Sequence, residues 1–251
     1  MRDLPRRTIT ALVYGAVVLA AVFAPPIVFV IVLILAGVVA LAELFALRRA
    51  GVVAVAAGAL VVVGLVALGV LRLATLYASA LLGGLIPNSA RAGGVSSWPY
   101  TLEIPYALVM VLFATWAADI FAYVGGSLLG RHKIAPSISP GKTWEGTLIG
   151  FAAATSVFLF MQQLFGNWYA FPLTAFHVDV AVAIAIGPAG FAGDLLESLV
   201  KRRAGVKDSG TFLPGHGGIL DRIDSLVATA PLALLPYLVP CCGPTSGMMG
   251  S

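Results

Sequence analysis

Residues 27–47 read Ile27-Val-Phe-Val-Ile-Val-Leu-Ile-Leu-Ala-Gly-Val-Val-Ala-Leu-Ala-Glu-Leu-Phe-Ala-Leu47. A helix needs about 20 mostly apolar residues to cross the hydrocarbon core of a bilayer, and this run is long enough. Comparable apolar runs recur along the chain, at residues 8–24, 52–71, 73–87, 104–126, 145–165, 178–200 and 224–240. The pattern predicts an all-α, polytopic integral membrane protein with about eight transmembrane helices, within a range of about seven to nine.

The composition supports a membrane protein. The chain of 251 residues is 60% hydrophobic and 10% charged, whereas soluble domains carry roughly 25% charged residues. The formal net charge is +4, but the basic residues stand in short clusters at the ends of apolar runs, such as Arg48-Arg49. This placement is typical of the cytoplasmic loops of membrane proteins. We therefore expect one integral membrane domain and no nucleic-acid partner.

The basic clusters also constrain the topology. If Arg48-Arg49 and the loop from Arg131 to Lys142 both face the cytoplasm, an even number of spans must lie between residues 50 and 130. The apolar runs there number three. We therefore expect one of the segments 52–71 and 73–87, which Arg72 separates, to belong to a bent or re-entrant element.

Charged residues gather in one stretch near the C-terminal end of the chain. Ten of the 31 residues from Asp194 to Asp224 are Asp, Glu, Lys or Arg. Ionised groups near hydrocarbon are costly unless they are paired, bind metal or reach water, so such a cluster indicates a functional site. Helical spacing places Asp194, Glu197, Ser198 and Lys201 on one face, and Asp221, Asp224 and Ser225 repeat the spacing. Asp194, Asp221 and Asp224 can then converge as hard oxygen ligands for Mg²⁺; the alternative is an internal salt-bridge network.

Between these two segments lies Pro214-Gly215-His216-Gly217-Gly218. Glycines allow successive backbone N–H groups to point at one anion, so this loop is predicted to hold phosphate. For His216 the alternative is a hydrogen bond that orders the loop. Cationic side chains surround the loop in the sequence, at Lys201, Arg202, Arg203, Lys207 and Arg222. They suit a polyphosphate substrate, although each alone also fits a positive-inside anchor, which is the interpretation that we favour for Arg203.

A second group of candidate residues lies upstream. Asp119 stands inside an apolar run with Tyr123 four residues later, and its alternative role is a hydrogen bond between packed helices. The triplet Gly141-Lys142-Thr143 invites comparison with a P-loop, but that motif needs a glycine where Pro136 stands and a strand before it, which we do not expect here. Lys142 and Thr143 instead suggest a site for a lipid head group or a nucleotide phosphate.

These segments together resemble the phosphatidate cytidylyltransferases, also called CDP-diacylglycerol synthases. The long match is Ser198-Leu-Val-Lys201-Arg202, then Lys207-Asp208-Ser209-Gly210, then Leu213-Pro214-Gly215-His216-Gly217-Gly218-Ile-Leu-Asp221-Arg222-Ile-Asp224. Asp119-Ile-Phe-Ala122-Tyr123 and Ser139-Pro140-Gly141-Lys142-Thr143-Trp144-Glu145-Gly146 are similar to two further motifs of the family. Many members carry lysine where Gly141 stands, which leaves Lys142 as the basic residue of that motif.

The resemblance covers roughly residues 119 to 230. It divides the chain into N-terminal transmembrane helices at 1–103, which match only in being hydrophobic, and a catalytic membrane part at 104–251 with its signature at 194–225. It implies a homodimer that uses Mg²⁺, with potassium as a candidate second cation. It also implies that Asp194, Asp221 and Asp224 occupy the metal-site positions.

The predicted reaction is transfer of a cytidylyl group from CTP to phosphatidic acid, giving CDP-diacylglycerol and pyrophosphate. Lys201, Arg202, Lys207 and Arg222 are assigned to the substrate phosphates, and Asp208 to positioning Lys207 or a metal-bound water. The glycine loop with His216 is assigned to the departing phosphates, and Ser198, Asp119, Tyr123, Lys142 and Thr143 to substrate binding. The active site is expected to face the cytoplasm from a multi-pass position in the plasma membrane, which is the inner membrane of a two-membrane cell.

Other functions remain open at this point. Another CTP-dependent lipid enzyme would act on an isoprenoid alcohol or an ether lipid. An ion-coupled transporter would use Asp119 and Asp194 as a relay, but it predicts broken helices with inverted halves rather than a glycine loop between charged clusters. A non-catalytic scaffold is the third alternative, and it leaves the charged cluster unexplained.

Overall fold

The computed structural model describes residues 4–85, 105–166, 176–213 and 217–235. Its main elements are helices, at α1 Leu4–Phe23, α2 Pro26–Ala46, α3 Val52–Leu85, α4 Tyr106–Leu129, α5 Trp144–Gly166, α6 Phe176–Arg203 and α7 Leu220–Thr229. Two short 3-10 helices, η1 Arg48–Ala50 and η3 Ala230–Leu234, and two short strands complete the described residues. The predicted all-α, polytopic architecture is confirmed, with one small hairpin added.

Five of the described helices are long and apolar enough to cross a membrane. These segments are Pro26–Ala46, Val52–Leu73, Tyr106–Leu129, Trp144–Leu164 and Val178–Arg203, and Leu12–Phe23 is a shorter apolar helix. On α2 the large apolar side chains Ile27, Ile31, Ile34, Leu35 and Val38 are exposed at helical spacing. A continuous apolar stripe on the outside of the protein is the surface that lipid contact requires.

The apolar run 52–71 and the described part of the run 73–87, one of which was expected to be bent or re-entrant, form one helix, and residues 86 and 87 lie outside the described residues. α3 runs without a break from Val52 to Leu85, so the expected separation at Arg72 was wrong. The Arg72 side chain is 3% exposed, and its Nη2 atom donates to the carbonyl oxygen of Ala24 at 2.8 Å. A buried guanidinium that donates a hydrogen bond to the protein is compatible with a continuous helix, because the group need not leave the helix to reach a polar partner. Among the described residues, α3 and α4 are then the two long helices between residues 50 and 130, which is an even number.

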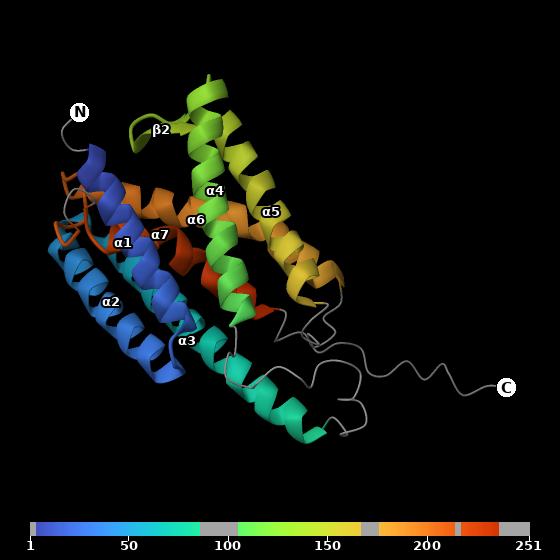
Figure 1. Cartoon of the computed structure of the whole chain (residues 1–251). Helices are drawn as coiled ribbons and strands as arrows, with labels where there is room; N and C mark the ends of the chain where they lie inside the picture. The colour runs from blue at the N-terminus through green and yellow to red at the C-terminus, as the bar shows by residue number, and fades with distance from the viewer. Residues whose placement is uncertain (1–3, 86–104, 167–175, 214–216, 236–251) are drawn as a thin grey trace.

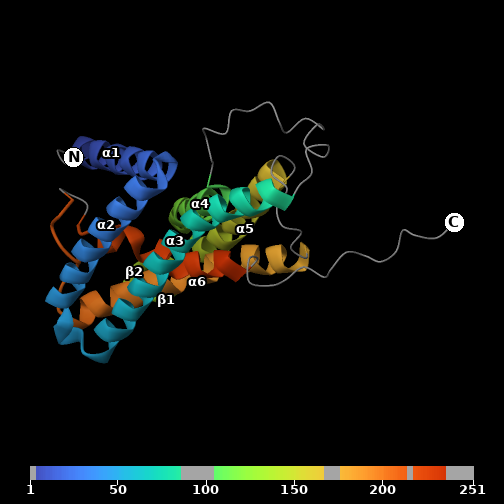
Figure 2. The same cartoon turned by 90° about the horizontal axis from the view of Figure 1, so that it is seen from below.

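The helices pack as a chain of neighbours around α3 and α6. α4 lies along α5, α5 packs on α6, α6 on α7, α7 on α3, and α3 on α2. Figures 1 and 2 show α3 crossing the length of the described body in both views. One buried apolar cluster includes Leu71, Val111, Phe158 and Ile186 from four different helices. α6 contacts α3, α4, α5 and α7, so it can present side chains to several neighbours.

α4 and α5 approach closely because their contact contains glycines. A Cβ atom added to Gly146 would lie 2.5 Å from the carbonyl oxygen of Ala122, and one added to Gly150 would lie 2.6 Å from that of Ala118. Small residues at such positions let membrane helices pack backbone to backbone. This close contact fixes the C-terminal half of α4, which contains Asp119, against the start of α5.

A two-stranded antiparallel hairpin connects α4 and α5. Strand β1 Lys133–Ala135 pairs with β2 Ser139–Thr143, with Lys133 opposite Thr143. The absence of a strand near Gly141-Lys142-Thr143 was thus a wrong expectation. The triplet nevertheless lies within β2 rather than in a loop between a strand and a helix, so the rejection of the P-loop stands.

The last expected span, 224–240, begins earlier and is shorter in the described residues. α7 starts at Leu220, extends for 10 residues, and continues into the 3-10 helix η3. Residues 236–240 lie outside the described residues. α7 packs against α6, and its N-terminal half carries Asp221 and Asp224.

Candidate functional site

A cavity of about 660 Å³ lies between α4, the hairpin, α5, α6 and α7. It is lined by residues that the sequence analysis singled out in three separate segments. These are Asp119, Tyr123, Lys142, Thr143, Asp194, Lys201, Asp208, Asp221, Arg222 and Asp224, together with Glu197 and Ser225. A smaller cavity of about 190 Å³ adjoins it, and Asp119, Asp221, Arg222 and Asp224 line both. The fold thus brings the three segments together around one cavity.

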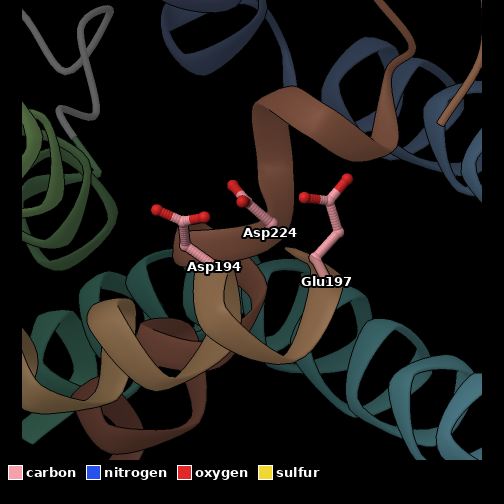
Figure 3. Close-up of side chains that lie close together, drawn as sticks. All are labelled: Asp194, Glu197 and Asp224. Carbon is pink, nitrogen blue, oxygen red and sulfur yellow. The ribbon is translucent and has the colours of Figure 1, made fainter. Parts of the chain in front are cut away.

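Three carboxylates meet at the wall formed by α6 and α7. Asp194 and Glu197 extend from α6, and Asp224 extends from α7 toward them (Figure 3). One oxygen from each of the three lies within 4.8 Å of the others. The side chain of Glu197 is 5% exposed, and its Oε1 atom is buried with no hydrogen-bond partner among the described residues. A buried carboxylate oxygen without a partner, next to two further carboxylates, fits a bound cation.

Asp221 lies in the same cavity, but it is bonded to groups of the protein, whereas the sequence predicted it to be a metal ligand. The Nζ atom of Lys201 bonds to Asp221 at 2.7 Å and to Glu197 at 2.6 Å. The Oδ2 atom of Asp221 also accepts hydrogen bonds from the backbone N–H groups of Ser209 and Gly218. Burial raises the pKa of Asp221, but the hydrogen bonds to its oxygens outweigh burial and hold the pKa below its usual range. Asp221 is thus an ionised group that is largely satisfied by the protein itself.

Lys142 connects the hairpin to α6. Its Nζ atom lies 2.6 Å from Oδ2 of Asp194 and 4.4 Å from the ring centroid of Phe191. The neighbouring Thr143 is buried, and its Oγ1 atom accepts a hydrogen bond from the backbone N–H of Gly146 at 3.3 Å. This contact caps the start of α5. The motif at 139–146 therefore contributes one cation to the cavity and one helix cap beside it.

The glycine loop is described only in part. Gly215 and His216, which were assigned to phosphate, lie outside the described residues. Gly217 has a φ of 83°, a conformation that favours glycine, and its carbonyl oxygen accepts a hydrogen bond from the N–H of Leu213. The N–H of Gly218 points at Asp221 at 2.8 Å. The described end of the loop thus holds a carboxylate of the protein.

The remaining predicted residues take different positions. The hydroxyl of Ser198 is close to Asp194, with its Oγ atom 3.3 Å from Oδ1. Arg202 is exposed, and its guanidinium donates to the carbonyl oxygens of Ile138 and Val206. Lys207 is exposed too. Arg202 thus joins the end of α6 to the hairpin, and neither Arg202 nor Lys207 is among the residues that line the larger cavity.

One acidic residue at the edge of the site was not predicted. Glu43 lies in α2, and its carboxylate accepts hydrogen bonds from the backbone N–H of Ile219 at 3.1 Å and of Leu220 at 2.9 Å. The hydroxyl of Ser209 lies 3.1 Å from the same carboxylate. The available signal was simple: Glu43 is an acid within an otherwise apolar span, and such acids need a partner.

Comparison with known proteins identifies relatives of this region. A model of the Cytidylyltransferase family matches residues 95–239. A phosphatidate cytidylyltransferase of Brucella abortus is 45% identical over 134 residues, which cover 52% of this chain and 46% of the relative. One from Haemophilus influenzae is 43% identical over 131 residues, covering 50% of this chain and 43% of the relative. One from Synechocystis is 43% identical over 152 residues, covering 57% and 50%. The aligned region spans about half the length of these curated relatives.

Proposed function

The chain belongs to the cytidylyltransferase family, and we propose that it transfers a cytidylyl group from CTP to phosphatidate. The products are CDP-diacylglycerol and pyrophosphate. The relatives that carry the name phosphatidate cytidylyltransferase support this substrate pair. The apolar outer surface supports a lipid substrate that stays in the bilayer.

The observation that carries the proposal is one cavity that holds both signs of charge. Three carboxylates gather on α6 and α7, and Lys142 and Lys201 bond directly to acidic groups of the cavity. A site that binds a nucleoside triphosphate needs anionic ligands for a cation and cationic groups for phosphate oxygens. Both sets come from the segments that resemble the family motifs.

The reaction requires no strong base. An oxygen of the lipid phosphate, already ionised near neutral pH, forms a bond to the α-phosphorus of CTP. The bond from that phosphorus to the bridging oxygen breaks, and pyrophosphate leaves with the electron pair. Catalysis then consists of in-line alignment and charge neutralisation. Lys142, Lys201 and Arg222, which line the cavity, would stabilise the phosphate charge.

The three carboxylates that meet on α6 and α7 fit a divalent cation, and we infer that the cation is Mg²⁺. Hard oxygen ligands are those that Mg²⁺ prefers, and it usually retains waters and substrate phosphate oxygens. Asp194, Glu197 and Asp224 would hold it, and it would neutralise negative charge on the phosphates. Asp221 remains a predicted ligand, and it would have to exchange its bond with Lys201 for the metal. Potassium as a second cation also remains a prediction.

Three further residues have proposed roles. Asp208 lines the cavity and is proposed to orient Lys207 or a metal-bound water, while Gly215 and His216 are proposed to hold the departing phosphates.

We propose that the site opens toward the cytoplasm from the plasma membrane. CTP can then arrive from water while the acyl chains remain in the leaflet. We also propose a homodimer.

The decisive experiment uses the purified protein in detergent with labelled CTP, phosphatidate and Mg²⁺. The expected product is the liponucleotide, absent without divalent cation and reduced at least about 100-fold by Asp224→Asn. Arg49→Gln, which removes an exposed charge in η1, is the control and should retain product formation. Parallel reactions with an isoprenoid alcohol phosphate and an ether-linked phosphatidate distinguish the related lipid enzymes. No liponucleotide from any acceptor would contradict the proposal.

A further inference from the structure

Glu43 reaches the start of α7 from a distant part of the chain. It is 177 residues away from Leu220 in sequence, and it lies outside the region 95–239 that matches the family. Its two carboxylate oxygens accept hydrogen bonds from two successive backbone N–H groups, those of Ile219 and Leu220. The first N–H groups of a helix have no partner within the helix. Glu43 therefore supplies partners that α7 lacks.

α7 has no cap of its own at this end. Ile219 precedes the helix with helical φ and ψ angles, and its side chain makes no capping hydrogen bond. A helix of this length is marginal without external contacts. A carboxylate at the N-terminus also interacts favourably with the helix dipole. The position of the first turn of α7 thus depends on a side chain from α2.

The start of α7 contains two acidic residues of the site. Asp221 lies in the first turn of α7 and Asp224 directly after it, and Asp224 is one of the three carboxylates that meet in the cavity. A second contact runs through Ser209, whose Oγ atom lies 3.1 Å from Glu43 and 3.0 Å from Asp221. Ser209 has one hydroxyl hydrogen, so the two carboxylates compete for it. Both routes connect Glu43 to acidic residues of the cavity.

Two glycines of the signature segment show how closely Glu43 approaches. A Cβ atom added to Gly210 would lie 2.5 Å from Oε1 of Glu43, and one added to Gly218 would clash with Oε2. Neither residue is among the described glycines with positive φ. Space for the carboxylate, rather than backbone conformation, is the reason for glycine at both positions. The segment is shaped around Glu43 as well as around a substrate.

We propose that Glu43 is a positioning residue of the active site. It acts through the backbone of Ile219 and Leu220 and through Ser209 to set the orientation of Asp221 and Asp224. The expected effect on turnover rests on the proposed cytidylyl transfer. The expected effect on metal binding rests on the three carboxylates of α6 and α7. It assigns to residues 1–103 a contribution to the catalytic part.

The test compares Glu43→Gln and Glu43→Ala with the unmodified full-length protein. Gln keeps the size and one acceptor oxygen, whereas Ala removes the cap entirely. Binding of Mn²⁺ without substrates is followed by electron paramagnetic resonance, and kcat and the KM for CTP are measured with Mg²⁺. We expect Mn²⁺ affinity to fall about 10-fold in Glu43→Ala and less in Glu43→Gln, with kcat lowered in the same order. Val38→Ala, on the exposed face of α2, is the control for a change in this helix.

Thermal unfolding separates positioning from a merely structural role. If both variants bind Mn²⁺ and turn over as the unmodified protein does, or lose activity only in parallel with thermal stability while Mn²⁺ affinity is unchanged, the inference is overturned. If Glu43→Ala does not fold, Glu43→Gln decides. If the unmodified protein binds Mn²⁺ but makes no liponucleotide, the proposed function fails while Mn²⁺ binding still tests Glu43.

Discussion

The Nζ atom of Lys142 on β2 lies 2.6 Å from Oδ2 of Asp194 on α6. This contact joins two segments that are far apart in the sequence, and it places a cation against the group of carboxylates proposed to bind metal. The same lysine lies over the ring of Phe191. Lys142 would therefore compete with a metal ion for Asp194, and we expect it to contact a substrate phosphate when a metal is bound.

Removing this cation should have opposite effects on metal binding and on turnover. Lys142→Met removes the ion pair with Asp194 and makes the cavity more negative, so we expect Mn²⁺ to bind several-fold more tightly. Turnover should fall about 10-fold or more because a phosphate loses a cationic contact. Arg131→Ala, at an exposed position before the hairpin, is the control. Weaker Mn²⁺ binding in Lys142→Met would contradict this account.

Substitution of Glu197 and of Asp221 can show which of these two residues binds the metal ion. Lys201 bonds to both carboxylates. Glu197 keeps a buried oxygen without a partner among the described residues and lies with Asp194 and Asp224, whereas the second oxygen of Asp221 accepts hydrogen bonds from Ser209 and Gly218. We expect Glu197→Gln to weaken Mn²⁺ binding at least about 10-fold, and Asp221→Asn to weaken it less. Titration of Mn²⁺ by electron paramagnetic resonance measures both. The reverse order would assign the metal to Asp221, as the family resemblance implies.

The close approach of the glycine segment to Glu43 predicts a steric effect. Gly218→Ala would place a methyl group against Glu43 and Ser209, so we expect at least about a 10-fold loss of kcat/KM and a lower thermal midpoint. Gly15→Ala is the matched control, because nothing lies within 4 Å of a Cβ atom at that position in α1. Equal behaviour of the two variants in assays of turnover and unfolding would show that the segment can relax around the added methyl group.

The low pKa of Asp221 predicts a pH dependence of stability. Because the folded protein lowers the pKa of this carboxyl, the ionised group stabilises the fold at all pH values above its ordinary pKa of about 3.9. That contribution is lost as the pH falls through the lowered pKa. The difference in thermal midpoint between the unmodified protein and Asp221→Asn should therefore be constant from neutral pH to about pH 5 and decrease below about pH 4. A difference that grows in acid would contradict the sign.

Most helices could be predicted from apolar periodicity and length. The run 27–47 corresponds to α2, Pro26–Ala46, and the run 104–126 to α4, Tyr106–Leu129. The prediction failed at Arg72 because a charge within an apolar run was taken as a boundary. In the structure this charge is buried and bonded to the carbonyl oxygen of Ala24. That contact is long-range, and no local pattern reports it.

The site shows the same division between local and long-range information. Helical spacing correctly placed Asp194, Glu197 and Lys201 on one face of α6, since all three line the same cavity. Spacing could not show that Lys201 would bond to both Glu197 and Asp221, or that Glu197 would lie beside Asp194 and Asp224. It also could not show the partner of Glu43, because that contact depends on how α2 and α7 pack.

The continuous course of α3 has a consequence for how the protein sits in the bilayer. At 1.5 Å per residue, Arg72 lies about 30 Å along the helix axis from Val52, and about 30 Å is also the thickness of the hydrocarbon core. A crossing of the membrane that begins at Val52 would therefore end near Arg72, whose guanidinium is buried and donates to the carbonyl oxygen of Ala24. The whole of α3 has 34 residues and is about 51 Å long, so it exceeds the hydrocarbon thickness and must tilt or extend beyond the lipid core.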